Sequence, residues 1–140
     1  MALPSKIRLE MVTPDRLLLS EEVDAVTIPG SEGYLGVLPG HLPLLTSLGV
    51  GILSYRFKGL QYFYAVSDGF AEILPDRVIV MARTVESPEE IDVERARIAK
   101  EHAEKRLFTE KVLDVPAVMA DLFRATTRLE VARLRNPKPQ

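Results

Sequence analysis

The 140-residue sequence has no cysteine and only two histidines, so most chemistry based on sulfur or imidazole is missing from it. Without a thiol the chain can form no disulfide, no cysteine nucleophile and no cysteine-based zinc site. His41 and His102 stand far apart in the sequence, and neither is accompanied by a plausible nucleophile and orienting carboxylate. The spacing of metal ligands and a phosphate-binding loop that ends in Lys-Ser/Thr are also absent. These absences predict a protein that is not an enzyme and holds no metal.

A strong net charge and an uninterrupted membrane-spanning segment are missing as well. The formal net charge is −2, which gives no electrostatic reason to expect nucleic acid as a partner. Residues 33–55 carry no formal charge, but their two prolines and five glycines are incompatible with a helix exposed to lipid. The N-terminus passes directly into a strand pattern, without a secretion or transit signal. Because 46% of the residues are hydrophobic, we expect a folded chain with a real core.

The first 86 residues follow the two-residue period of β-strands. Ile7, Leu9 and Met11 alternate with charged residues, as in a strand with one buried face. Further strand patterns cover residues 16–20, 23–28, 50–57, 60–66, 69–74 and 77–83, and short turns separate them. This close spacing predicts an antiparallel β-sandwich, or flattened barrel, as the first domain.

Near Ser87 the period changes to that of helices, which predicts a second domain over residues 87–140. Ser87, Pro88 and Glu90 match a capping box, so we expect it to start a first helix over residues 91–107. One face of that helix would carry Ala96, Ala99, Ala103 and Leu107.

A second helix is predicted to start at Asp114, with Pro116 in its first turn, and to stop at Asn136. Its apolar stripe would consist of Val115, Met119, Leu122, Thr126, Leu129 and Ala132. The short connection over residues 108–114 predicts an antiparallel helical hairpin. Alanine side chains bury little apolar area, and each Å² of buried area stabilises a fold by only about 25 cal/mol. We therefore expect the hairpin to be only marginally stable alone and able to exchange partners. The fold class is therefore β + α.

Three motifs occur in a fixed order along the chain. Residues 30–45, GSEGYLGVLPGHLPLL, combine glycines and prolines with a hydrophobic skeleton, which is typical of tight turns between short buried strands. Residues 66–73 read VSDGFAEI, and residues 91–96 read IDVERA at the start of the hairpin. In sequence and spacing these motifs closely resemble the epsilon subunits of F-type rotary ATP synthases, and the resemblance covers nearly the whole chain.

The resemblance implies a non-catalytic subunit of the central stalk, which couples rotation of the c-subunit ring to the catalytic head while proton motive force drives ATP synthesis. The sandwich would bind the gamma subunit, and a turn formed by Ser31, Glu32, Gly33 and Tyr34 would contact the c-ring. The helical hairpin would act as a brake on ATP hydrolysis. Together with the missing transit signal, the resemblance implies a peripheral location on the cytoplasmic face of a bacterial membrane, held there only through the complex.

The resemblance further implies ATP as a regulatory ligand, with no cofactor required. Residues 91–96 match the Ile/Leu-Asp-x-x-Arg-Ala pattern with which many bacterial members hold ATP in the folded hairpin. The Asp92 carboxylate would accept a hydrogen bond from adenine, Arg95 would pair with phosphate, and Ala96 would leave room for the ligand. The full implied set is Glu86, Ile91, Asp92, Arg95, Ala96, Arg124 and Arg128.

One position departs from this pattern, because His102 stands where nucleotide-binding members carry a further arginine. On the alternative interpretation Asp92 and Arg95 form an i, i+3 ion pair, and Arg124 and Arg128 form a solvated stripe.

The cations are unevenly distributed between the two halves. Seven of the eleven cationic residues after position 86 are arginines, and arginine suits phosphate and carboxylate partners, so the helices are where an anionic partner would bind. In an extended hairpin, an acidic surface of a catalytic beta subunit within the alpha/beta hexamer would be contacted by four arginines: Arg124, Arg128, Arg133 and Arg135.

A rival interpretation from another class is a stand-alone nucleotide-sensing module, a β-sandwich with a helical lid. Tight binding to a gamma subunit would separate the two.

Overall fold

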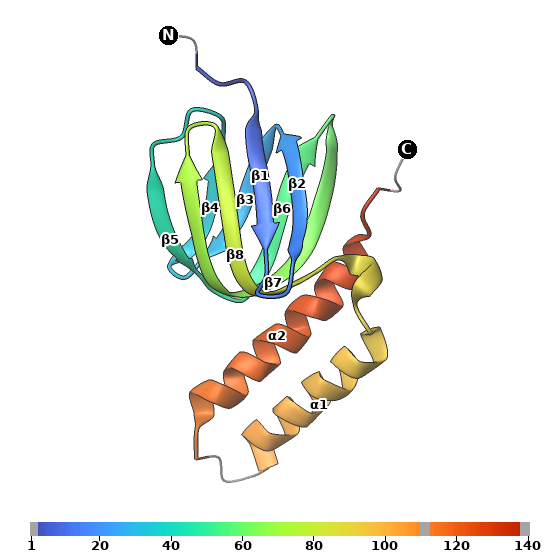
Figure 1. Cartoon of the computed structure of the whole chain (residues 1–140). Coiled ribbons are helices and arrows are strands. Elements are labelled where there is room, and N and C mark those ends of the chain that lie inside the picture. Colours follow the sequence, from blue (N-terminus) through green and yellow to red (C-terminus); the bar gives the residue numbers. More distant parts are fainter. Residues whose placement is uncertain (1–2, 110–112, 138–140) are drawn as a thin grey trace.

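In the computed structural model, which describes residues 3–109 and 113–137, eight strands are followed by a short 3-10 turn and two helices (Figure 1). The predicted β + α class is confirmed. The strands are β1 Ile7–Val12, β2 Leu17–Val23, β3 Ala25–Gly30, β4 Gly33–Val37, β5 Leu44–Leu48, β6 Gly51–Phe57, β7 Leu60–Leu74 and β8 Arg77–Glu86. The 3-10 turn η1 covers Pro88–Glu90, and the helices are α1 Val93–Thr109 and α2 Val115–Leu134.

The strands form a sandwich that β6 closes on one side. Their order is β2-β1-β8-β7-β5-β3-β4, and β6 pairs with both β3 and β7. Most neighbouring strands run antiparallel, as predicted. The exception is the pair β1 and β8, which run parallel to each other. The helices lie together at one end of the sandwich, opposite the N-terminus (Figure 1).

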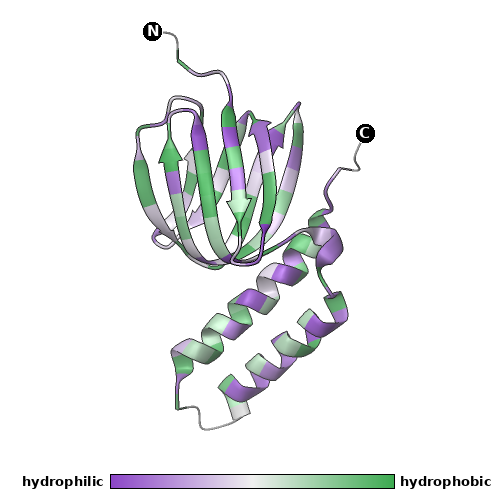
Figure 2. Cartoon of the chain, in the orientation of Figure 1, coloured by the Kyte–Doolittle hydropathy of each residue, from purple (hydrophilic) through white to green (hydrophobic). Residues whose placement is uncertain are grey.

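The sandwich core consists of side chains from the strands. Ile7, Leu9 and Met11 are fully buried, as their alternation predicts. Along the strands, hydrophobic and hydrophilic residues alternate in bands (Figure 2). None of the described residues of α1 or α2 belongs to this core, so the sandwich fills its interior without the helices.

The residue at position 69 must be a glycine. Gly69 has a φ of +149°, and a Cβ there would lie 2.0 Å from the carbonyl oxygen of Met81 on the neighbouring strand. Only a residue without a side chain allows β7 and β8 to approach this closely.

The start of the first helix differs from the prediction. Ser87 does not cap α1: its hydroxyl donates to Glu90 Oε1 at 2.9 Å within η1, and the chain is extended again at Ile91. Helix α1 begins at Val93, because Asp92 Oδ1 accepts a hydrogen bond from the Arg95 amide at 3.0 Å, as an N-cap residue does. The predicted cap of α2 is confirmed, since Asp114 Oδ1 accepts from the Ala117 amide at 3.1 Å.

The buried faces of the two helices also differ in part from the predicted stripes. On α1, Ala96 and Ala103 are buried, whereas Ala99 is exposed and Leu107 is half-buried. On α2 the buried residues are Val118, Ala125 and Val131, none of which was in the predicted stripe. The difference arises because α2 contacts both α1 and the strands β6 and β7, so its buried residues do not lie along one line.

Candidate functional site

The two helices, called here the helical hairpin, meet the sandwich along a narrow seam. A small apolar cluster at this seam contains Val131 of α2, Ile91 before α1 and Ala65 of β7. Val131 is fully buried, and Ile52 and Ala132 pack beside the cluster. Among the residues that the structure describes, this cluster and the sandwich core have no member in common. The hairpin therefore rests on the sandwich through a small contact of its own.

Two arginines of α2 connect the hairpin to strands. Arg128 Nε donates to Glu86 Oε1, at the end of β8, at 2.6 Å. Arg124 Nη1 lies 3.8 Å from Asp68 Oδ2 on β7, and Arg124 Nη2 donates to Asp121 within α2 at 2.5 Å. The structure thus brings together three residues of the predicted nucleotide set, Glu86, Arg124 and Arg128, but in contacts with the protein itself. These arginines are not the solvated stripe of the alternative interpretation, since about two-thirds of each side chain is covered.

A third polar contact lies just beyond α2, where the sequence indicated only the end of a helix. Asn136 Oδ1 accepts from the Phe63 amide at 2.7 Å, and Asn136 Nδ2 donates to the Phe63 carbonyl at 3.1 Å. The first part of β7 extends past the end of β8, which pairs with β7 only from Ala65 onward. The side-chain amide of Asn136 therefore takes the place of a neighbouring strand at this open edge.

The other members of the predicted nucleotide set lie at the start of α1. Asp92 is the N-cap residue, so one carboxylate oxygen is engaged with the helix backbone. The Arg95 side chain is exposed and, among the described residues, forms no ion pair, so the alternative Asp92–Arg95 ion pair is not present. Ile91 and Ala96 are buried, Ile91 in the seam cluster.

A cavity of about 180 Å³ lies between the two helices. Its polar lining consists of His102, Arg106, Arg124 and Arg128, together with Asp121, which pairs with Arg124. Arg106 was missed by sequence reasoning, although it lies four residues after His102 and therefore on the same helix face. Asp92 and Arg95 do not line this cavity. Its volume is below the roughly 300–1,000 Å³ typical of ligand pockets, so a nucleotide would need the helices to separate or the ion pairs to open.

Of the predicted ring-contacting residues, Ser31 and Glu32 form the turn between β3 and β4, and Gly33 and Tyr34 begin β4. Ser31 Oγ lies 2.5 Å from Ser47 Oγ, and the Tyr34 hydroxyl accepts from the Ile52 amide at 3.0 Å. Gly33 has a φ of +136°, as the tight turn requires. Glu32 is exposed and, within residues 3–109 and 113–137, makes no hydrogen bond or ion pair. Its carboxylate is therefore available to a partner, and the exposed part of the Tyr34 ring lies close by in the sequence.

An apolar face, defined here by Leu45, Phe70 and Met81, lies on the outside of β5, β7 and β8. Phe70 and Met81 are directly opposite each other on neighbouring strands, and Leu45 follows the same face of β5. Their exposed fractions are 66%, 55% and 44% in the order named, which is unusual for adjacent large apolar side chains. The sequence did not indicate this surface, because nothing in a strand pattern distinguishes an apolar residue that faces outward from one that faces the core.

Arg133 and Arg135, at the end of α2, are exposed, unlike Arg124 and Arg128. Two of the four predicted contacts to a catalytic beta subunit are thus covered when the hairpin lies on the sandwich. In the part of the chain that the structure describes, no helix has the length and apolar character needed to cross a membrane.

Comparison with known proteins gives matches over nearly the whole chain. The family model "ATP synthase, Delta/Epsilon chain, beta-sandwich domain" matches residues 6–88, and "ATP synthase, Delta/Epsilon chain, long alpha-helix domain" matches residues 89–133. The ATP synthase epsilon chain of Syntrophobacter fumaroxidans is 48% identical over 128 residues, covering 91% of this chain and 96% of the relative. The epsilon chain of Koribacter versatilis is 51% identical over 100 residues, covering 71% of this chain and 70% of the relative.

Two solved structures are also similar. A chain of the Euglena gracilis mitochondrial ATP synthase, in a structure of OSCP, F1 and the c-ring, superposes with a TM-score of 0.82 at 30% identity, covering 96% of this chain and 85% of that chain. A chain of the central stalk and c-ring of the Tetrahymena thermophila mitochondrial ATP synthase has a TM-score of 0.56 at 15% identity, covering 95% of this chain and 98% of that chain, which shows likeness of fold alone.

Proposed function

Since the chain belongs to the delta/epsilon family of ATP synthase chains and is an epsilon subunit of the central stalk, we propose that it couples rotation of the c-subunit ring to the catalytic head without itself catalysing a reaction. Its helical hairpin restrains ATP hydrolysis when it leaves the sandwich and extends toward the alpha/beta hexamer. The subunit lies on the cytoplasmic face of a bacterial membrane and is held there through the complex, where proton motive force drives ATP synthesis.

The observation that carries this proposal is the separation of the seam from the sandwich core. The hairpin rests on one small apolar cluster, two arginine contacts and the Asn136 hydrogen bonds. Moving a two-state element from 1:99 to 99:1 takes about 5.5 kcal/mol of differential binding. The few contacts that hold the hairpin contribute a free energy of this order, so a partner or ligand can displace the hairpin while the sandwich stays folded.

The sandwich supplies the fixed part of the coupling. The apolar face of Leu45, Phe70 and Met81 suits a large protein partner that stays bound, and we assign it to the gamma subunit. The turn from Ser31 to Tyr34 presents the Glu32 carboxylate, and we assign it to the polar loops of the c-ring. Both contacts are needed if rotation of the ring is to reach the stalk.

Co-purification with gamma tests the coupling role and excludes the stand-alone sensor. Wild-type chain should be retained on immobilised gamma, and Phe70→Asp should abolish retention because it places a charge in the apolar face. Leu60→Asp, which changes an exposed leucine at the first position of β7, is the matched control and should bind normally. Failure of wild-type chain to bind gamma would favour the sensor.

Inhibition of hydrolysis is tested in the reconstituted synthase. Reversing the charges of Arg124 and Arg128 should relieve inhibition, but these residues also anchor the folded hairpin to Asp68 and Glu86. The paired variant Arg133→Glu/Arg135→Glu tests the contact without disturbing the folded hairpin, because both side chains are exposed there. It should raise hydrolysis, whereas Arg56→Glu on β6 should not. Unchanged hydrolysis in both arginine pairs would refute the beta-subunit contact.

We further propose that ATP binds the folded hairpin as a regulatory ligand. The arginines of the cavity between the helices can turn to phosphate once their ion pairs open, and Arg95, which lies outside this cavity near the start of α1, is exposed and has no competing partner among the described residues. Isothermal titration should show ATP binding that Arg95→Ala weakens about tenfold or more, since a charged hydrogen bond contributes roughly 1.5–3 kcal/mol. Arg97→Ala on the same helix is the control, because Arg97 is already paired with Glu94 and Glu101. Equal affinities for the two variants would place ATP elsewhere.

A further inference from the structure

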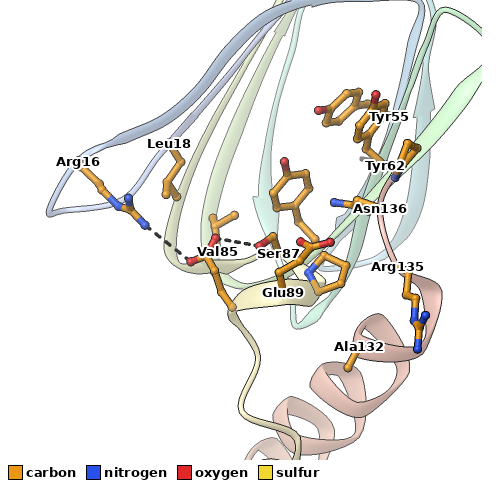
Figure 3. Close-up of a pocket in the computed structure, with 14 residues that line it drawn as sticks. Arg16, Leu18, Tyr55, Tyr62, Val85, Ser87, Glu89, Ala132, Arg135 and Asn136 are labelled. Atoms are coloured by element: carbon orange, nitrogen blue, oxygen red, sulfur yellow. Dashed lines mark hydrogen bonds and ion pairs between the residues drawn. The ribbon is translucent and has the colours of Figure 1, made fainter. Parts of the chain in front are cut away.

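A second cavity, of about 720 Å³, lies at the end of the seam away from the arginine contacts. Three parts of the chain form it: the strands supply Tyr55, Tyr62 and Tyr64, η1 supplies Glu89, and the end of the hairpin supplies Ala132 and Pro137. Figure 3 shows Tyr55 and Tyr62 of the strands, Glu89 of η1 and Ala132 of α2 around the cavity. Its volume is within the range of ordinary small-molecule sites. No residue of the predicted nucleotide set lines it.

The three tyrosines form one stack along the wall of this cavity. The ring centroids of Tyr55 and Tyr62 are 4.8 Å apart with planes 8° from parallel, and those of Tyr55 and Tyr64 are 6.1 Å apart at 16°. Tyr55, in the middle, is buried, while Tyr62 and Tyr64 are only half-buried. Tyr55 and Tyr62 are paired across strands β6 and β7, so the stack is held by the sheet. Such a preformed aromatic wall favours a flat ligand.

The charges around the stack favour a cation. The Glu89 side chain lies among the cavity residues, and within the described residues it has no ion pair (Figure 3). Arg16 is turned toward Glu90, 3.7 Å away, and the Arg135 guanidinium points away from the tyrosines (Figure 3). Burial raises the pKa of Tyr64, a hydrogen bond with Tyr55 lowers it, and the nearby Glu89 and Glu90 carboxylates raise it; the net effect is a raised pKa, so the hydroxyl stays neutral. The wall thus combines aromatic faces with an unpaired carboxylate, which attract organic cations.

We propose that this cavity binds a small planar aromatic cation and that its occupant holds the hairpin on the sandwich. The coupling follows from the lining, because Ala132, Asn136 and Pro137 are in place only while the end of α2 rests on β7. A ligand that contacts both sides binds the folded arrangement better than the released one and so shifts the equilibrium toward it. This site is separate from the cavity between the helices, and the inference does not depend on ATP binding there.

Titration calorimetry of the full chain with proflavine, a planar cation, tests the site. The tricyclic anion 9-anthracenecarboxylate serves as the charge control and should bind at least about tenfold more weakly. Glu89→Gln should weaken proflavine binding about fivefold and Tyr62→Leu about tenfold, whereas Tyr62→Phe, which keeps the ring, should restore it. Glu72→Gln, a carboxylate on the outside of β7, is the matched control and should bind as wild type does.

A second measurement follows the hairpin directly. Because the chain has no cysteine of its own, a spin label reacts only with cysteines that are introduced. We place them at two exposed positions, Ser20→Cys on β2 and Phe108→Cys near the far end of α1. Proflavine should increase the population at the short, folded distance, and Glu89→Gln should reduce that effect. The proposal is overturned if proflavine does not bind, if the anion binds equally well, if Glu89→Gln and Tyr62→Leu leave the affinity unchanged, or if occupancy does not change the distance distribution.

Discussion

Replacing Asn136 with alanine should release the end of α2 from the sandwich. The substitution removes both hydrogen bonds to Phe63, at 2.7 Å and 3.1 Å, without changing the sandwich core. A hydrogen bond in a folded protein contributes about 0.5–1.5 kcal/mol net, so the pair contributes about 1–3 kcal/mol. That free energy corresponds to an increase of about 5–150-fold in the released population.

Amide hydrogen exchange in the last turn of α2, residues 131–134, is the direct assay. The Phe63 N–H cannot serve as the reporter, because the substitution removes its own acceptor. In the Asn136→Ala variant the amides of residues 131–134 should exchange faster, by up to about 5–150-fold, while amides in the interior of the sandwich keep their rates. Glu130→Ala, at an exposed position of α2, is the control and should leave these rates unchanged.

Two results would refute this reasoning. If the amides of residues 131–134 exchange at the wild-type rate in Asn136→Ala, the contact does not hold the end of the helix in solution. If all the sandwich amides accelerate together, the substitution acts on global stability, and the seam is not an independent unit.

Three further predictions concern stability. Gly69→Ala should lower the free energy of unfolding by about 3 kcal/mol or more, because its Cβ would meet the Met81 carbonyl at 2.0 Å, whereas Gly36→Ala, with nothing within 4 Å of a Cβ, should have little effect in urea unfolding. Val131→Ala should weaken the seam by about 2 kcal/mol, so that amides of α1 and α2 exchange faster while the urea midpoint of the sandwich is unchanged; a fall in that midpoint would contradict separate cores. The Lys6 ammonium, which donates to Asp24, holds the pKa of Asp24 below its ordinary value, so this pair stabilises the fold at neutral pH and the stabilisation is lost as pH falls through and below about 4. Asp24→Asn should therefore reduce the acid dependence of unfolding in that range, and an unchanged pH profile would exclude this contribution.

The strands could be predicted from the sequence because their signal is local. Ile7, Leu9 and Met11 alternate with charged residues, and all three are fully buried. The start of α1 could not be assigned in the same way, because Ser87 and Asp92 both match N-cap preferences. Tertiary packing decides between them: Ile91 inserts into the seam cluster with Val131 and Ala65, which keeps the chain extended there and leaves Asp92 as the cap.

The buried face of α2 was predicted wrongly for a related reason. Its partners are not on one side, since Ala125 lines the cavity with α1 while Val131 packs against the sandwich. A single stripe at helical spacing cannot describe a helix with two partners. The Asn136 contact and the tyrosine-lined cavity were missed because each joins segments far apart in the sequence, and neither Asn136 nor a tyrosine in a strand carries a distinctive local signal.

Within residues 3–109 and 113–137 the sandwich core and the seam cluster share no side chain, and this separation has an evolutionary consequence. Substitutions can accumulate inside the sandwich without compensating changes in the helices, and the reverse also holds. Only the few residues that touch across the boundary, such as Glu86 with Arg128, need to change in concert. Grafting the helices of one relative onto the strands of another should therefore yield well-behaved chimeras once those boundary residues are matched.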